Sequence, residues 1–147
     1  MAGGFDPKTF TTTPFQKRVE KPWGYEIIYT APHALAVGKI LHVLAGKRLS
    51  LQYHDTKQET LCLTAGRATI TITNEQDETN DIPMELYKGY AIVPGQIHRV
   101  TAVTDIDFIE ASTPEAGNTV RLEDDANRPT ETEAMRQTEN RGWSKQS

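Results

Sequence analysis

Four side chains that could bind a metal ion lie at informative spacing in the sequence: Gln52, His54, Glu59 and His98. Gln52 and His54 are two residues apart, so on a β-strand their side chains point to the same face. Glu59 follows after a short polar stretch that lets the chain turn into the next strand. The Pro94–Gly95 turn leads into the strand of His98. Two imidazoles, a carboxylate and an amide oxygen suit zinc, manganese, iron or nickel and leave coordination positions open for a substrate.

The segments around these residues have the pattern of an all-β domain. Between Trp23 and Ser112, short apolar runs rich in β-branched residues alternate with Gly, Asn and Asp. The clearest strand is 67–73, in which the apolar side chains fall on one face and the polar ones on the other. Further strands are expected at 24–30, 34–44, 49–54, 60–63, 90–93, 98–103 and 107–111. Closely spaced strands with short connections favour a closed barrel or jelly roll over an open sheet with exposed edges.

The 147 residues correspond to one domain, which we divide into three parts. Residues 1–21 are rich in Thr, Pro and Lys and are expected to form an extended arm, residues 22–114 a barrel, and residues 115–147 a polar tail. Within the barrel, the acidic stretch 74–85 is expected to be an exposed hairpin loop. Within the tail, 130–140 could hold a short helix with Thr130 as its N-cap and Glu133 three residues later.

Composition and charge exclude several classes of protein. Hydrophobic residues make up 37% and charged residues 24% of the chain, a globular balance, and no apolar stretch is long enough to cross a bilayer. The N-terminus does not resemble a secretory signal, and the single Cys62 cannot form an internal disulfide, so we expect a cytoplasmic protein. The net charge of -4 argues against nucleic-acid binding. Because five acidic residues lie in the 74–85 loop, this charge does not exclude an anionic small substrate.

The ligand spacing resembles the two motifs of the cupin superfamily. Every interval of the first motif is matched, with Gln52 in place of the first histidine, by Gly46, Gln52, His54, Glu59 and Gly66. The second motif is matched by Gly89, Pro94, Gly95 and His98, although Pro94 directly precedes Gly95. The resemblance implies a single double-stranded β-helix, a jelly-roll barrel, around one divalent metal ion. The implied ligands are Gln52, His54, Glu59 and His98, with zinc as the first choice of metal and manganese, iron or nickel as alternatives.

Gln52, at the first ligand position of the first motif, limits the resemblance to a smaller group of cupins. Together with KPWGYE at 21–26, the His98–Arg99 pair and VRLEDDANR at 120–128, it is similar to the C-terminal cupin domain of bacterial type II mannose-6-phosphate isomerases. Lys57 and Leu61 stand where that family has Arg and Trp, and Ala126–Asn127 precede Arg128 in place of a YGR-like ending. The resemblance implies a metal-dependent aldose–ketose isomerase that acts on a sugar or a sugar phosphate.

Such an isomerase needs a base besides the metal. It removes a proton from the carbon next to a carbonyl and returns it to the neighbouring carbon, while the metal stabilises the enediolate. The candidate bases are Lys39, which matches a lysine recurrent in isomerase-like cupins, Glu110 and His42. Strict alternation places Lys39 and His42 on opposite faces of their strand, so at most one should enter the barrel unless Gly38 permits a bulge. Glu110 lies in an apolar run and needs a charge partner, for which Lys39 is a candidate.

A sugar phosphate also needs cationic groups to hold it, since guanidinium forks match phosphate oxygens. The candidates are Arg99 beside a metal ligand, Arg121 and Arg128 in the family-like tail, and Lys57.

The sequence is also compatible with two other functions, and it predicts an assembly state. The same donor set serves cupin dioxygenases, decarboxylases, epimerases and lyases that act on small polar substrates, and some cupins bind a sugar or a metal without turnover. The long arm at 1–21 and the habit of cupins to pair through sheet surfaces predict a homodimer.

Overall fold

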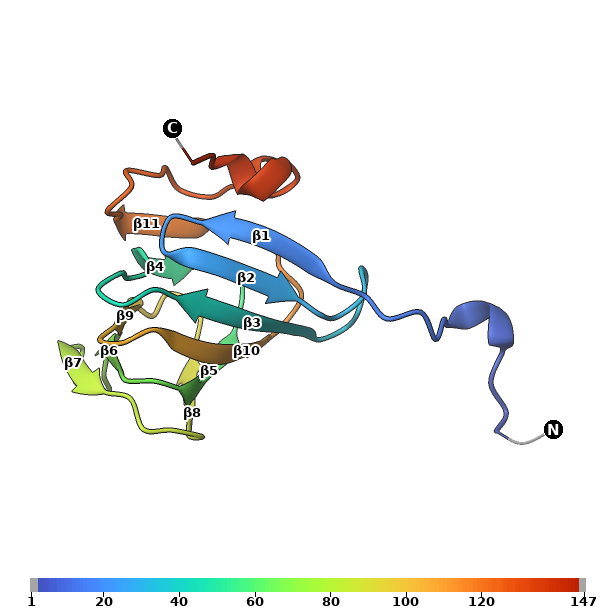
Figure 1. The fold of residues 1–147 in the computed structure, drawn as a ribbon, viewed down its shortest axis with the longest axis horizontal. Coiled ribbons are helices and arrows are strands. Elements are labelled where there is room, and N and C mark those ends of the chain that lie inside the picture. Colours follow the sequence, from blue (N-terminus) through green and yellow to red (C-terminus); the bar gives the residue numbers. More distant parts are fainter. Residues whose placement is uncertain (1–2, 146–147) are drawn as a thin grey trace.

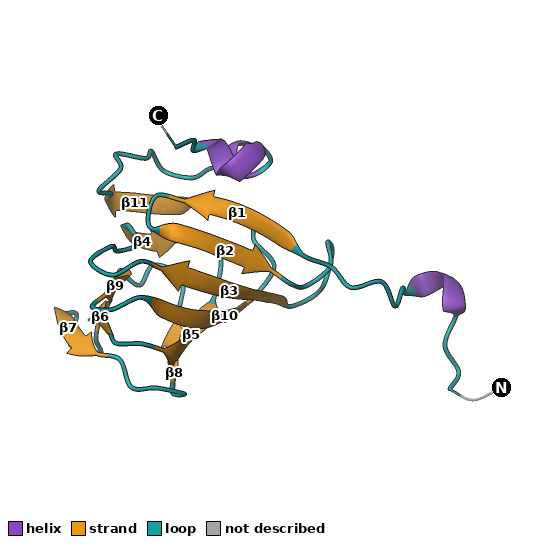
Figure 2. Cartoon of the chain, viewed as in Figure 1, coloured by secondary structure: helices purple, strands orange, loops and turns teal. Residues whose placement is uncertain are grey.

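A computed structural model of the chain describes residues 3–145 and has eleven strands and three short helices in this range (Figure 1, Figure 2). The strands are β1 (Lys17–Lys21), β2 (Gly24–Ile28), β3 (Val37–Val43), β4 (Leu51–His54), β5 (Glu59–Ala65), β6 (Ala68–Thr73), β7 (Thr79–Pro83), β8 (Gly89–Ile92), β9 (His98–Ala102), β10 (Ile106–Ser112) and β11 (Thr119–Glu123). The helices are η1 (Pro7–Thr9), α1 (Glu133–Arg136) and η2 (Glu139–Gly142). None of the described helices is long and apolar enough to cross a membrane. The predicted all-β class is confirmed.

The strands form two antiparallel sheets that enclose one apolar core. One sheet has the order β1-β2-β3-β10-β5-β8 and the other the order β11-β4-β9-β6-β7. Alternate residues of each strand face inward, as the period of two requires. Leu61 and Phe108 from the first sheet meet Ile70 and Val100 from the second, and each is at most 2% exposed. This two-sheet packing is the jelly roll expected from the sequence.

Three strands lie where the sequence led us to expect an arm, a loop and a tail. β1 falls in the expected arm, β7 in the acidic stretch 74–85, and β11 in the expected tail, so the sheets extend past residues 22–114 at both ends. β7 pairs with β6 as the second half of a hairpin, and every one of its residues is exposed. β1 buries a single residue, Val19. These edge strands carry almost no apolar alternation, because only one side or neither contacts the core.

The tail lies close to β1 and β11 (Figure 1). Glu131 forms a β-bridge with Thr119, and η2 contacts β1 through a hydrogen bond from the Glu20 backbone N to Asn140 Oδ1 at 2.9 Å. The expected helix is present as the single turn α1, but its N-cap is Thr132, whose hydroxyl accepts from the Met135 backbone N. The predicted cap, Thr130, instead accepts from the backbone N of Arg121.

At the other end, residues 3–16 extend away from the barrel (Figure 1). Phe5 and Phe10 pack edge to face at 5.2 Å between ring centroids, and both stay about half exposed.

Candidate metal centre and its cavity

The three predicted ligands with ionisable side chains come together inside the barrel. His54 ends β4, Glu59 begins β5 and His98 begins β9, and their ligand atoms all lie within 4.8 Å of one another. Glu59 Oε1 is 3.2 Å from His54 Nε2 and 3.0 Å from His98 Nε2. All three residues are at most 3% exposed. His54, Glu59 and His98 therefore form a candidate metal-binding triad.

The hydrogen bonds behind the triad aim both imidazoles at its centre. Nδ1 of His98 donates to the Gln96 carbonyl oxygen at 2.9 Å, and this contact turns Nε2 toward Glu59. Nδ1 of His54 lies 3.1 Å from the Thr119 hydroxyl. Outer hydrogen bonds of this kind fix the orientation of metal-binding histidines.

Two buried polar atoms of the triad lack a hydrogen-bond partner among the described residues: Glu59 Oε2 and His98 Nε2. Glu59 Oε2 has the Lys57 ammonium 3.2 Å away as an ion-pair partner, and His98 Nε2 faces Glu59 Oε1 at 3.0 Å, where a metal ion would be coordinated by both side chains. Burial raises the pKa of Glu59, but the Lys57 ammonium and the two histidine contacts outweigh burial and hold this pKa well below its usual range. Burial lowers the pKa of His54, which favours the neutral imidazole that binds metals. The donor set and its protonation thus fit a divalent metal ion.

Gln52, the fourth predicted ligand, pairs with His98 in the register of β4 and β9. It lines the same cavity as His54, as the two-residue spacing predicts. Its Oε1 accepts a hydrogen bond from the Ser50 hydroxyl at 2.5 Å. Its role as a ligand stays a prediction.

The triad adjoins a cavity of about 60 Å³ whose wall is mostly charged. At roughly 30 Å³ for each water in the liquid, a cavity of this size holds about two water molecules. Its wall contains His54 of the triad, Gln52, three carboxylates (Glu26, Glu110 and Glu131) and six cations (Lys21, Lys39, Lys57, Arg121, Arg128 and Arg141). The excess of cations suits an anionic ligand.

Glu110 joins the metal centre to this charged wall. It lies directly opposite Lys39 in the register of β10 and β3, and its Oε2 is 3.2 Å from Lys57 Nζ and 3.8 Å from Lys39 Nζ. Lys57 Nζ is also 3.2 Å from Glu59 Oε2. Burial and the negative charge of Glu59 raise the pKa of Glu110 to about 7. A carboxyl group with such a pKa can both take and give a proton near neutral pH.

The structure separates the other two candidate bases as strict alternation requires. Lys39 is 3% exposed and lines the cavity, where it pairs with Glu115 and, at 3.6 Å, with Glu26. His42 faces out of the barrel, 2.8 Å from Asp107 Oδ1 and stacked on Tyr25. His42 lines a separate groove of about 760 Å³ and not the metal cavity. The regular register of β3 leaves no bulge at Gly38.

Three of the four predicted substrate cations line the cavity: Arg121, Arg128 and Lys57. Arg99 does not, because it follows His98 on β9 and therefore faces the opposite side of the sheet. Its guanidinium donates to the carbonyl oxygens of Leu49 and Glu123. Arg128 is held by a paired contact with Asp124 at 2.9 and 3.0 Å.

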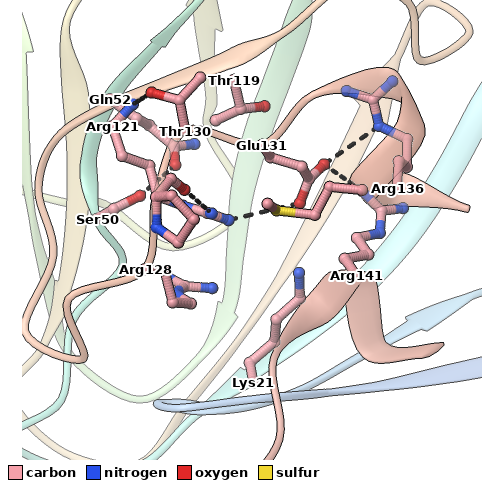
Figure 3. Close-up of polar contacts among 12 residues, drawn as sticks. Lys21, Ser50, Gln52, Thr119, Arg121, Arg128, Thr130, Glu131, Arg136 and Arg141 are labelled. Carbon is pink, nitrogen blue, oxygen red and sulfur yellow. Dashed lines mark hydrogen bonds and ion pairs between the residues drawn. The ribbon is translucent and has the colours of Figure 1, made fainter. Parts of the chain in front are cut away.

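Several wall residues were not identified from the sequence. Glu131 and Arg141 come from the tail (Figure 3), and their polar surroundings in the sequence gave no signal. Lys21 and Glu26 belong to the KPWGYE segment, which contributed to the family resemblance but gave neither residue a predicted role in the site. The contacts among these residues join β1, β2, β11 and the tail around the mouth of the cavity.

The similarity of the chain to known proteins lies in its fold. No family model and no curated protein matches the sequence. Among solved structures, the chain is similar to oxalate decarboxylase from Bacillus subtilis, with a TM-score of 0.65 and 16% identity over 78% of this chain and 33% of that one. It is similar to the formate complex of Lactobacillus farciminis oxalate decarboxylase, with a TM-score of 0.65 and 17% identity over 78% of this chain and 37% of that one.

A third structure is the capsular polysaccharide assembling protein CapF from Staphylococcus aureus, with a TM-score of 0.55 and 14% identity over 85% of this chain and 33% of that one. The chain thus spans about a third of the length of these proteins. Identities this low show a fold and no activity. The resemblance to mannose-6-phosphate isomerases stays a prediction, and the chain has the cupin fold.

Proposed function

We propose that the chain is a metal-dependent cupin enzyme that moves a proton within a small substrate, as an aldose–ketose isomerase does with a sugar or a sugar phosphate. The observation that carries this proposal is the position of Glu110. It lies in the wall of a cation-rich cavity that is also lined by His54 of the triad. Proton transfer needs an acid–base group beside the metal, and Glu110 is placed to supply it.

In this proposal His54, Glu59 and His98 hold the metal, with Gln52 as fourth ligand and zinc as the first choice. A bound metal would supply stabilisation of negative charge on the substrate oxygens. Glu110 takes the proton from the carbon next to the carbonyl and returns it to the carbonyl carbon, while the proton of the adjacent hydroxyl passes to the former carbonyl oxygen, so the Glu110 carboxylate is regenerated in each cycle. The contact of Lys57 Nζ with Glu110 Oε2 fixes the carboxylate in place. Arg121 and Arg128 face an anionic group of the substrate.

The test is metal analysis followed by conversion of mannose 6-phosphate to fructose 6-phosphate. Glu110→Gln should bind metal as the wild type does and lose conversion by roughly a hundredfold or more, the usual contribution of a general base. His54→Ala should lose both metal and conversion, whereas His42→Ala, outside the cavity, should keep both. A metal-loaded wild type that converts no hexose or pentose phosphate would overturn the isomerase proposal. Tight sugar binding without turnover would then favour a binding role.

One observation favours a second candidate, a cupin decarboxylase that acts on a small acid. The cavity of about 60 Å³ is far below the roughly 300–1,000 Å³ of pockets for larger ligands and matches a ligand of a few heavy atoms. Release of carbon dioxide from oxalate by the manganese-loaded chain, without isomerase activity, would favour this candidate.

A further inference from the structure

Residues near the C-terminal end of the described chain form part of the cavity wall. We call residues 131–143 the C-terminal strap. Glu131 and Arg141 line the cavity from this strap, and Figure 3 shows Glu131 between the side chains of Arg121 and Arg136. Arg141 Nη1 is 2.6 Å from Glu115 Oε2 and 3.1 Å from Glu131 Oε1. The strap is therefore a wall of the site and not a tail beside it.

Polar contacts hold the strap on the barrel. Neither α1 nor η2 has a buried residue. The strap is attached by the ion pairs of Arg136 and Arg141 with Glu115, by the bridge of Glu131 to Thr119, and by the hydrogen bond to Asn140. Charged groups that leave a buried pair regain their hydration, so such contacts resist separation less than an apolar interface does. The strap is therefore attached to the barrel mainly through charged and polar groups.

The backbone of the strap is strained where Arg141 enters the cavity. Asn140 and Arg141 have φ of 46° and 55°, both in the left-handed region. Asn tolerates this region, but a residue such as Arg occupies it at a cost unless its surroundings hold it there. The contacts of Arg141 with Glu115 and Glu131 supply that restraint. The ion pairs of Arg141 therefore hold a strained backbone in place.

The cavity is too small for a sugar phosphate unless part of its wall moves. A space of about 60 Å³ cannot contain a sugar phosphate, and only a few water molecules fit beside the metal centre. This step rests on the proposed function, since a small acid would need less room than a sugar phosphate.

From the polar attachment of the strap, the strained backbone at Arg141 and the small volume of the cavity, we propose that the C-terminal strap is a gate beside the candidate metal centre, held in place by Arg141. The strap opens to admit a ligand, and on closing it returns Arg141 and Glu131 to the wall that faces the ligand. Arg141 is thus a positioning residue whose ion pairs set the fraction of time that the site is open.

Metal exchange tests the gate without any substrate. A gate changes the rates of entry and exit by one common factor and leaves the equilibrium unchanged. With Zn²⁺ as the probe and a chelator in stopped flow, Arg141→Ala should raise both the capture and the release rate by roughly tenfold or more, with an unchanged Kd, because charge-assisted hydrogen bonds are the strong class. Arg48→Ala removes the exposed pair with Asp125 on the neighbouring groove and should leave both rates unchanged. Wild-type rates in Arg141→Ala, or a change confined to release that raises Kd, would overturn the gate.

A second series avoids unpaired buried carboxylates and does not depend on metal binding. Asn140→Gly removes the hydrogen bond to Glu20, but glycine adopts the left-handed backbone conformation without strain. Asn140→Ala removes the same hydrogen bond and also destabilises this conformation. Amide hydrogen exchange in the strap should therefore speed up in the order wild type, Gly, Ala, while the barrel strands stay unchanged. Strap amides that exchange only together with the barrel in all three proteins would refute the gate. If none of Zn²⁺, Mn²⁺, Fe²⁺ and Ni²⁺ binds to the wild type, the proposed function fails, and this exchange series still decides the gate.

Discussion

The buried carboxylate of Glu26 should make this fold sensitive to acid in a way that one substitution can isolate. Glu26 is 2% exposed and lies among three cations, with Lys21 and Lys39 at 3.6 Å and Arg141 at 3.9 Å. Burial raises its pKa, but these cations outweigh burial and lower the pKa to about 2 from the ordinary 4.5. The folded protein therefore prefers the ionised form, and the unfolded chain does not share this preference.

The sign and size of the effect follow from proton linkage. Because the pKa is lower in the folded state, Glu26 contributes stability that is complete above about pH 4.5 and is lost as the pH falls toward 2. A shift of about 2.5 pKa units corresponds to roughly 3 kcal/mol. Glu26→Gln cannot ionise, so its stability lacks this contribution at every pH. The free-energy difference between wild type and variant should be near its maximum at pH 7 and shrink by about 3 kcal/mol toward pH 2.

Urea unfolding followed by tryptophan fluorescence at several pH values between 7 and 2 measures this difference directly. Other acidic groups also titrate in this range, but they are shared by both proteins and largely cancel in the difference. Glu85→Gln is a matched control, because Glu85 and its partner Lys88 are both about two-thirds exposed and their pair should contribute little at any pH. A difference between wild type and Glu26→Gln that stays constant from pH 7 to 2 would refute the reasoning.

Three further predictions concern the metal, an alkaline transition and assembly. On β9, His98→Ala should abolish binding of a divalent metal after dialysis, whereas Arg99→Ala should retain it because that side chain faces away from the triad; equal retention by both variants would remove His98 from the site. Burial lowers the pKa of Lys21 to about 8, so the charged form of this buried side chain destabilises the fold at neutral pH. The free energy of unfolding, measured with urea, should therefore rise between pH 8 and about 10.5 in the wild type but not in Lys21→Met. Removal of residues 1–16, which spares β1, should weaken the predicted homodimer in sedimentation experiments, and unchanged association would leave the arm without this role.

The metal centre was predictable because its signal is local. The two-residue spacing of Gln52 and His54 fixes a common strand face, and short turns bring Glu59 and His98 to the same end of the barrel. The same rule of alternation excludes Arg99 once His98 points inward, so Arg99 should not have been expected to contact the substrate. The error arose from reading nearness in sequence as nearness in space.

The strap and the edge strands carried no comparable signal. Arg141 pairs with Glu115, 26 positions earlier, across a tail that has no apolar period, and charged residues in such a segment are usually solvated. β7 has no buried residue, so nothing in its composition separates it from a loop. Both features depend on tertiary contacts of polar groups, which leave no periodic trace in the sequence.

The wall of the cavity contains many ionisable residues, and the reason can be either stability or ligand binding. Buried ion pairs add little net stability compared with apolar packing of the same volume, because desolvation offsets most of the attraction. Apolar residues at Lys21, Glu26 and Lys39 would therefore fold at least as well, yet would give a wall that cannot exchange partners with an anion. A wall of paired charges is already oriented, and each pair can give up part of its contact to a ligand without leaving a group unsatisfied. The ionic wall is thus better explained by ligand binding than by stability, and it extends onto the strap through Glu131 and Arg141.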